Sequence, residues 1–188
     1  SHMYGLTTRM SNAFLADCLG ARYETGLNRM IVVSMGTGTS LVQCDGDDIR
    51  HIGGTGIGGG TLMGLSRIML KTDDIKQVYT LAQEGDISKI DVLIGDISPN
   101  PLPGLPRNAT ASLFGNAVLQ TIGSSCILSS LGSGIKKYVL IGNLTLLPQC
   151  TKVFPAMEKL YGVKFIIPKY SEFCTAIGAA LTYINEKK

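Results

Sequence analysis

Two glycine-rich segments carry the residue types that bind phosphate groups. Gly36-Thr37-Gly38-Thr39 lies between two short apolar runs, and residues 53–60 hold glycine at six of eight positions. Glycine lets main-chain N–H groups converge on an anion, and threonine hydroxyls supply further donors. The second segment runs into a predicted helix beginning near Thr61, where unpaired N–H groups and the helix dipole favour an anion. We therefore predict a phosphate site, with a plain hairpin turn and a flexible linker as the alternative interpretations.

The elements that must position these segments are predicted from hydrophobic periodicity and turn signals. Strands are predicted at 30–34, 40–44, 48–52, 137–142 and 163–168, and helices at 11–20, 61–70, 74–83, 109–131, 148–161 and 172–186. Residues 97–108 contain four prolines and are predicted to form a loop or lid. The order βββαβαβα predicts an α/β fold: an antiparallel meander followed by two crossovers. That order resembles one complete lobe of the actin-like (ribonuclease H-like) two-lobed kinase fold, and the resemblance implies a nucleotide bound between two such lobes.

Composition excludes several classes of protein. The 188 residues are 45% hydrophobic and 16% charged with a net charge of +3, which fits neither a disordered chain nor a nucleic-acid-binding surface. The five cysteines are odd in number, far apart and never in a CxxC pair, which argues against a disulfide framework or a zinc site, and no residue is assigned as a metal ligand. No apolar run reaches the roughly 18 residues of a membrane span. We expect a soluble, cytoplasmic chain without a nucleic-acid or membrane partner, preceded by a tag remnant at 1–3.

Six segments together resemble the type II pantothenate kinases, and they occur in the order of that family. They are VSMGTGTSLVQ (33–43), HIGGTGIGGGTLMGLS (51–66), LAQEGD (81–86), ASLFGN (111–116), VLIGN (139–143) and FCTAIGAAL (173–181). The resemblance implies ATP-dependent phosphorylation of pantothenate to 4'-phosphopantothenate in coenzyme A biosynthesis, an alcohol-accepting phosphotransferase reaction. It also implies ATP and Mg²⁺ as cofactors, a cytoplasmic location and a homodimer, for which the apolar helix at 118–131 is a candidate surface.

The resemblance and the glycine motifs together assign residues to the site. The predicted nucleotide-binding residues are Gly36, Thr37, Gly38, Thr39, Gly58, Gly59, Gly60, Thr61, Leu62, Met63 and Asn143. Arg50 and His51 occupy the place where the family has a basic residue near its substrate. Because side chains alternate along a strand, only one of these two is expected to face the site.

The chain departs from the family at the catalytic carboxylate. The position of the family's catalytic glutamate holds Ala13 here, and a methyl group cannot accept the proton of the substrate hydroxyl. Asp17 lies one helical turn away and is a weaker candidate for that role. Two alternatives therefore stand beside an active pantothenate kinase: a non-catalytic, nucleotide-binding regulatory or scaffold protein, and a sugar kinase of the same fold.

Relative to the family, two stretches have no counterpart. One is the N-terminal strand pair with its Asp-Ala-Gly-Gly-Thr phosphate loop, which would fall between Met3 and Tyr4, and the other falls near Ala117-Val118. Either these segments were left out and the rest joined, or the chain is truncated and should not turn over substrate. We accordingly expect residues 4–29 to be a helical segment leading from an N-terminal lobe, and residues 30–188 to be the C-terminal actin-like lobe.

Overall fold

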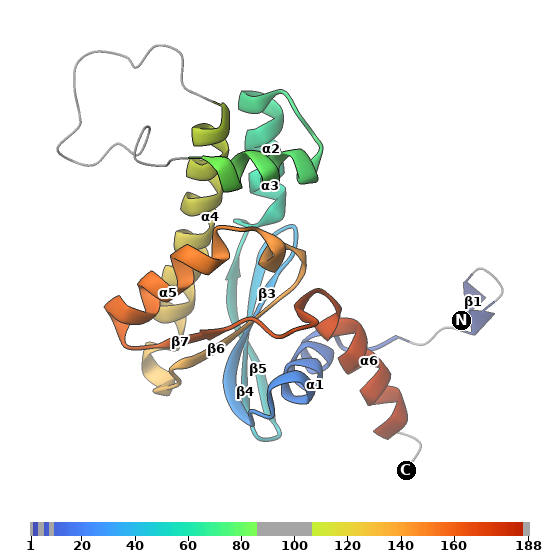
Figure 1. Ribbon diagram of the computed structural model, residues 1–188. Helices are drawn as coiled ribbons and strands as arrows, with labels where there is room; N and C mark the ends of the chain where they lie inside the picture. Colours follow the sequence, from blue (N-terminus) through green and yellow to red (C-terminus); the bar gives the residue numbers. More distant parts are fainter. Residues whose placement is uncertain (1, 4–5, 8–9, 86–106, 186–188) are drawn as a thin grey trace.

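A mixed five-stranded sheet with helices on both faces forms the body of the protein (Figure 1). The computed structural model describes residues 2–3, 6–7, 10–85 and 107–185. The strands are β1 (His2–Met3), β2 (Leu6–Thr7), β3 (Arg29–Met35), β4 (Thr39–Asp45), β5 (Asp48–Thr55), β6 (Lys137–Ile141) and β7 (Lys164–Ile166). The α-helices are α1 (Ala13–Thr25), α2 (Gly59–Leu65), α3 (Ile75–Glu84), α4 (Arg107–Ser130), α5 (Cys150–Tyr161) and α6 (Cys174–Asn185). Short helical turns are η1 (Ser66–Leu70), η4 (Leu131–Ser133), η5 (Asn143–Leu146) and η6 (Ser171–Phe173).

The topology of the sheet confirms the predicted meander and crossovers. Its strand order is β5-β4-β3-β6-β7, while β1 and β2 form a separate antiparallel pair. β3, β4 and β5 are antiparallel neighbours, whereas β6 runs parallel to β3 and β7 runs parallel to β6. The parallel strands β3, β6 and β7 therefore bring their carboxyl ends to one edge of the sheet, the usual place for a ligand in open α/β folds.

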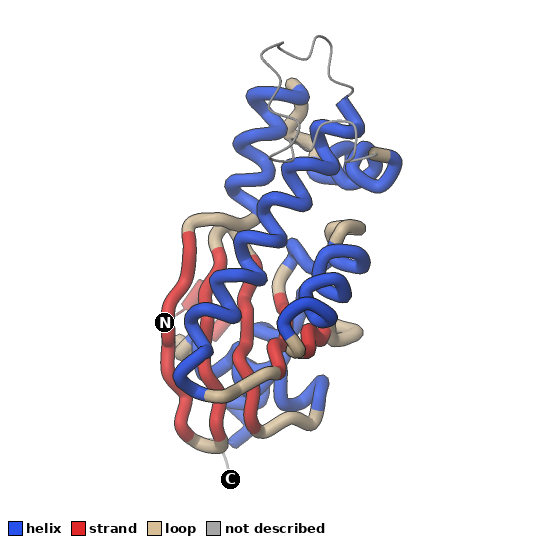
Figure 2. The backbone as a smooth tube through the Cα atoms, turned by 90° about the vertical axis from the view of Figure 1, so that its left-hand side faces the viewer, coloured by secondary structure: helices blue, strands red, loops and turns tan. Residues whose placement is uncertain are grey.

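Each face of the sheet has its own apolar core. On one face, Ile31, Val33 and Leu140 pack with residues of α4 and α5 in the larger cluster. On the other face, Val32 and Val139 pack with Cys18 and Ala21 of α1 and with Cys174 of α6. Seen from the side, the strands form a single layer with the long helix α4 running along it (Figure 2). Strand β3 is buried on both faces because it lies at the centre of the sheet.

Helix α1 begins as the sequence predicts but ends later. Asn12 caps it, since its Oδ1 accepts hydrogen bonds from the N–H groups of Phe14 and Leu15 at 2.9 and 3.3 Å. The predicted stop, Gly20, lies inside the helix, and the helix ends at Gly26 with φ of 68°. Gly20 is needed for packing: a Cβ there would overlap the carbonyl group of Cys174 in α6.

The predicted helix at 61–70 is divided in two. Helix α2 is followed directly by the π-helical turn η1, and the chain then turns at Lys71, which has φ of 56°. Helix α3 has nearly its predicted bounds and begins after Asp74, whose Oδ1 accepts a hydrogen bond from the N–H of Lys76 at 2.9 Å. Of the predicted loop at 97–108, residues 97–106 lie outside the described residues, and 107 and 108 begin α4.

The expectation that no segment reaches the length of a membrane span is wrong by length and composition. Within the described residues, Thr110–Ser133 forms 24 helical residues with mean hydropathy 1.3 over an 18-residue window. In the fold, 56% of that window is buried, and Leu119, Ile122 and Cys126 belong to the larger core cluster. The apolar character of α4 is accounted for by packing against the sheet.

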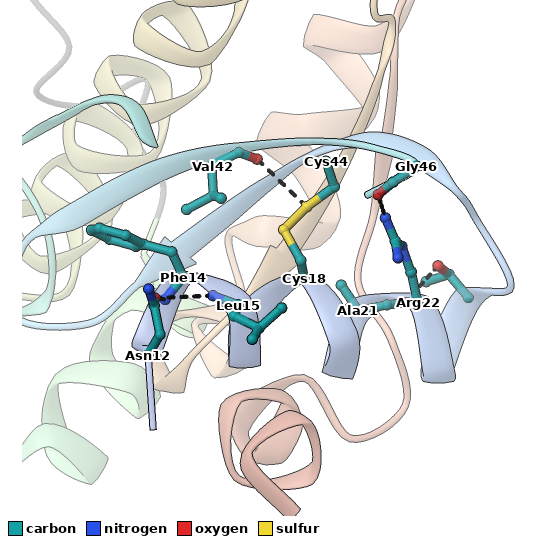
Figure 3. The surroundings of a disulfide bond; sticks show 10 residues. Asn12, Phe14, Leu15, Cys18, Ala21, Arg22, Val42, Cys44 and Gly46 are labelled. Atoms are coloured by element: carbon teal, nitrogen blue, oxygen red, sulfur yellow. Dashed lines mark hydrogen bonds between the residues drawn. A yellow bond between two sulfur atoms is a disulfide. The ribbon is translucent and has the colours of Figure 1, made fainter. Parts of the chain in front are cut away.

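The five cysteines do include a disulfide, which the sequence analysis argued against. Cys18 of α1 and Cys44 of β4 are bonded, with their Cα atoms 6.1 Å apart and a separation of 26 positions in sequence (Figure 3). The spacing of the two cysteines in the sequence does not predict this pair, because α1 must lie across β4 before the two sulfur atoms can meet. Nearby, the guanidinium group of Arg22 donates a hydrogen bond to the carbonyl oxygen of Gly46. The disulfide between Cys18 and Cys44 therefore holds α1 against the sheet.

The other three cysteines are buried thiols: Cys126, Cys150 and Cys174. Burial raises the pKa of Cys126 and Cys150 to about 12 each. For Cys174, burial together with the nearby carboxylates Glu24, Asp17 and Glu172 raises the pKa to about 12. Neutral thiols of this kind are poor nucleophiles, so these three cysteines serve as packed side chains.

Candidate functional site

The two glycine-rich segments form one hydrogen-bonded unit. The N–H groups of Gly59 and Gly60 donate to the carbonyl oxygens of Gly36 and Thr37, each at 2.8 Å. The hydroxyl of Thr39 donates to the carbonyl oxygen of Ile57 at 2.8 Å, which ties the end of the first segment to the second. We call residues 36–39 and 53–61 together the paired glycine loops.

Close backbone contact explains why glycine is needed at Gly58. A Cβ at this position would lie 2.7 Å from the carbonyl oxygen of Thr37, 2.8 Å from the Cα of Gly38 and 2.9 Å from the carbonyl oxygen of Gly36. All three neighbours are backbone atoms, which cannot move aside as a flexible side chain can. A Cβ on Gly56, by contrast, would meet nothing within 4 Å. The paired glycine loops thus depend on particular glycines rather than on general flexibility.

This geometry corrects one expectation about how an anion would be held. The N–H groups at the start of α2 were expected to be unpaired, yet those of Gly59 and Gly60 are already bonded to the first loop. The hydroxyl of Thr61 likewise donates to the carbonyl oxygen of Gly56 at 3.2 Å. Within the part of the chain that is described, the N–H groups of Thr37 and Gly38 donate to no other residue. The N–H groups of Gly56 and Thr61 in the second loop likewise have no acceptor among the described residues, so donors for an anion remain in both loops.

The paired glycine loops and Asn143 lie beyond neighbouring strands at the same edge of the sheet. The first loop follows β3, and Gly142 and Asn143 follow β6, which is parallel to β3. Gly142 has φ of 96°, its N–H donates to the carbonyl oxygen of Ser171 at 2.9 Å, and a Cβ there would lie 2.6 Å from the carbonyl oxygen of Met35. Asn143 is exposed, and its carbonyl oxygen accepts a hydrogen bond from the hydroxyl of Tyr79 at 3.4 Å.

Two of the predicted nucleotide-binding residues point into the core. The side chain of Leu62 is fully buried in the larger core cluster, and Met63 packs partly against the same cluster. The side chains of these two residues therefore hold α2 on the body of the protein.

The structure distinguishes Arg50 from His51. The ring of His51 stacks on that of Phe14, with centroids 4.6 Å apart and planes at 14°. His51 pairs with Val42, which faces α1, so His51 lies on the face of the sheet that carries Ala13. Arg50 pairs with Gln43 on the opposite face and forms an exposed ion pair with Asp48 at 2.8 Å. Of the two, His51 lies beside the start of α1.

The model of the Fumble family matches residues 21–129, more than half of the chain and including both glycine loops. This chain belongs to the Fumble family, the type II pantothenate kinases. The family assignment agrees with the resemblance drawn from the motifs.

Two curated relatives of this Fumble-family chain come from bacteria. A type II pantothenate kinase of Bacillus anthracis is 35% identical over 127 residues, covering 64% of this chain and 46% of the relative. One of Staphylococcus epidermidis is 37% identical over 92 residues, covering 49% of this chain and 35% of the relative. The chain thus spans at most about half the length of these curated relatives.

Solved structures confirm the actin-like fold. The activator of the 2-hydroxyisocaproyl-CoA dehydratase from Clostridium difficile, with bound ADPNP, has a TM-score of 0.57 at 12% identity and covers 93% of this chain and 66% of its own. The ethanolamine utilization protein EutJ from Carboxydothermus hydrogenoformans has a TM-score of 0.56 at 16% identity and covers 87% of this chain and 52% of its own. At such identities the likeness establishes the fold alone.

In this Fumble-family chain, Ala13 is the exposed first residue of α1 and Asp17 is buried one turn later. Asp17 is only 4% exposed, and its Oδ1 accepts a hydrogen bond from the hydroxyl of Thr175 in α6 at 2.6 Å. Burial raises the pKa of Asp17, while hydrogen bonds from Thr175 and Ser34 partly offset the rise. No signal in the sequence links Thr175 to Asp17, because their hydrogen bond depends on α6 lying against α1.

The described residues offer no protein-only metal site. Among residues 10–85 and 107–185, no group of three or more His, Cys, Asp or Glu side chains could hold a metal ion. Mg²⁺ in phosphate-transfer sites is bound largely by phosphate oxygens and water, with one or two carboxylates. The described residues supply no such carboxylate on the paired glycine loops, so we assign no metal ligand and derive no step through the ion.

Proposed function

We propose that this chain binds ATP through the paired glycine loops and belongs to a pantothenate kinase that forms 4'-phosphopantothenate in coenzyme A biosynthesis. The observation that supports this most is the bonding of the two loops into one unit at the edge where β3 and β6 end. Such an arrangement fixes the backbone around the N–H groups of Thr37 and Gly38, which have no acceptor among the described residues. Phosphoryl transfer depends mainly on positioning and on stabilising charge, which fixed amide donors provide.

In this proposal the first loop contacts the phosphates and the second loop supports it. Thr37 and Gly38 donate main-chain hydrogen bonds to phosphate oxygens, while Gly58, Gly59 and Gly60 hold the first loop in place. Asn143, exposed at the end of β6, contacts another part of the nucleotide. The relative from Clostridium difficile carries ADPNP, an ATP analogue, on the same fold, which is consistent with this use.

On the substrate side, His51 lies on the face of the sheet that carries Ala13 and is the better of the two proposed pantothenate contacts. Ala13 supplies no proton acceptor, and Asp17 is enclosed between α1, β3 and α6. These two observations favour a second candidate function: a nucleotide-binding homologue with impaired catalysis or a regulatory role. A sugar kinase of the same fold is the third candidate and differs in substrate alone.

We further propose that residues 30–188 are the C-terminal lobe of the kinase and that residues 4–29 lead from an N-terminal lobe. Two copies would pair through this lobe, with the second half of α4 as the candidate surface, where Leu128 and the following Leu131 are 68% and 71% exposed. The kinase would act in the cytoplasm. Because disulfides are rare in that compartment, the redox state of Cys18 and Cys44 in cell extracts tests the location.

The experiment is a calorimetric titration with ATP followed by an assay of pantothenate phosphorylation. Wild type is compared with Ala13→Glu, and Ala180→Glu, an exposed position on α6, is the matched control. Turnover gained only by Ala13→Glu supports a kinase that lacks its proton acceptor. ATP binding without turnover in any variant favours the nucleotide-binding homologue. Phosphorylation of a hexose with pantothenate inert supports the sugar kinase, and absence of ATP binding overturns the proposal.

A further inference from the structure

A cavity of about 680 Å³ lies between α3, α4 and α5, away from the paired glycine loops. None of residues 36–39, 53–61 or Asn143 lines it. Its volume is within the range of small-molecule sites, which is about 300–1,000 Å³. The cavity therefore needs an explanation separate from nucleotide binding.

The two long walls of the cavity differ in chemistry. Helix α4 presents Ser112, Asn116 and Gln120, three uncharged hydrogen-bonding side chains spaced four residues apart and so on one face of the helix. Helix α5 presents Val153, Met157 and Leu160, an apolar face at helical spacing. A molecule between them would meet hydrogen-bonding groups on one side and hydrocarbon on the other.

A buried amide in the wall lacks one hydrogen-bond partner. Gln149 is 6% exposed, and its Nε2 donates to the carbonyl oxygen of Ala82 at the end of α3 at 2.5 Å. Its Oε1 is buried and has no partner among the described residues. An unsatisfied buried acceptor costs about 1–3 kcal/mol, so a donor brought by a ligand or by water would be favoured here.

The charged side chains around the cavity indicate the charge of the molecule that it would bind. Lys152 is the only charged side chain among the described residues that line the cavity, and it is exposed. Its ammonium group attracts an anion, and the described lining includes no carboxylate that would repel one.

We propose that this cavity is a binding site for a small amphipathic anion, with its apolar part against Val153 and Met157 and its charged group near Lys152. The donor that Gln149 lacks would come from the polar part of the same molecule. The site is independent of the proposed kinase activity, because it shares no lining residue with the paired glycine loops.

The probe for the test is 8-anilinonaphthalene-1-sulfonate, which combines an aromatic body, an N–H donor and a sulfonate. Its binding is followed by fluorescence for Lys152→Met and for Ala156→Phe, which fills the cavity from the exposed side of α5. The controls are Lys159→Met, an exposed lysine of the same helix that does not line the cavity, and Ala180→Phe on α6. Thermal unfolding shows whether each variant remains folded.

We expect Ala156→Phe to weaken binding of the probe by about tenfold or more and Lys152→Met by about threefold, with both controls within about twofold of wild type. Saturating ATP should leave binding of the probe unchanged. Equal affinity in wild type, Lys152→Met and Ala156→Phe would overturn the proposal, as would displacement of the probe by ATP. If Ala156→Phe fails to fold, Lys152→Met against Lys159→Met decides the question.

Discussion

Gly58→Ala is the substitution that most directly separates the paired glycine loops. The added Cβ would lie within 3.0 Å of backbone atoms of Gly36, Thr37 and Gly38, so the two loops must move apart. Forcing an extra carbon into a packed site costs about 1–3 kcal/mol. The movement would also strain the hydrogen bonds from Gly59 and Gly60, and each such bond contributes about 1 kcal/mol.

If the paired glycine loops bind ATP, this disturbance should weaken ATP affinity by about tenfold, since 1.4 kcal/mol corresponds to a factor of ten. Calorimetric titration of wild type, Gly58→Ala and Gly56→Ala with ATP measures the effect. Gly56→Ala is the matched control because its Cβ meets nothing within 4 Å, and it should bind within about twofold of wild type. Equal losses in both variants, or wild-type affinity in Gly58→Ala, would refute the reasoning.

Three further predictions concern stability. Gly178→Ala should lower the free energy of unfolding by about 3 kcal/mol, because its Cβ would overlap the carbonyl of Ala16. Gly64→Ala is the control: its Cβ meets open space, so it should raise the free energy of unfolding by about 0.5–1 kcal/mol. Denaturant unfolding measures both, and similar effects of the two substitutions would contradict the close crossing of α1 and α6. Burial raises the pKa of Asp17, so the stability that its protonated form contributes is lost as the pH rises from about 3.9, the unfolded pKa, through the pKa of the folded protein. Over that interval, Asp17→Asn should gain stability relative to wild type, as measured by unfolding at a series of pH values. A stability difference that does not depend on pH would contradict this prediction. Dithiothreitol should lower the free energy of unfolding of wild type by about 3 kcal/mol, because it reduces the disulfide between Cys18 and Cys44. It should leave the stability of the double variant Cys18→Ala/Cys44→Ala unchanged. A wild type whose stability does not respond to the reductant would contradict the presence of the disulfide.

The sheet was predictable because its signals are local. The continuous apolar run of β3 is typical of a central strand, and Asp45-Gly46-Asp47 marks the turn between β4 and β5. The end of α1 was not predictable from Gly20. A glycine that stops a helix and a glycine that admits a crossing helix look the same in sequence, and only the position of α6 separates them.

The candidate site was located from the sequence, but its hydrogen bonding was not. Glycine-rich segments serve both phosphate contact and close backbone packing, and here Gly58, Gly59 and Gly60 serve the packing while Thr37 and Gly38 keep free N–H groups. The pairing of Cys18 with Cys44 also depends on a long-range contact, which no sequence spacing encodes.

The most direct test of the phosphate site is a titration of ¹⁵N-labelled protein with ATP, monitored at the main-chain amides. The account predicts the largest chemical-shift changes at Thr37 and Gly38, with smaller changes at Gly59 and Gly60, whose N–H groups are already bonded within the protein. Saturating ATP that leaves Thr37 and Gly38 unshifted, or that shifts only amides remote from the paired glycine loops, would contradict it.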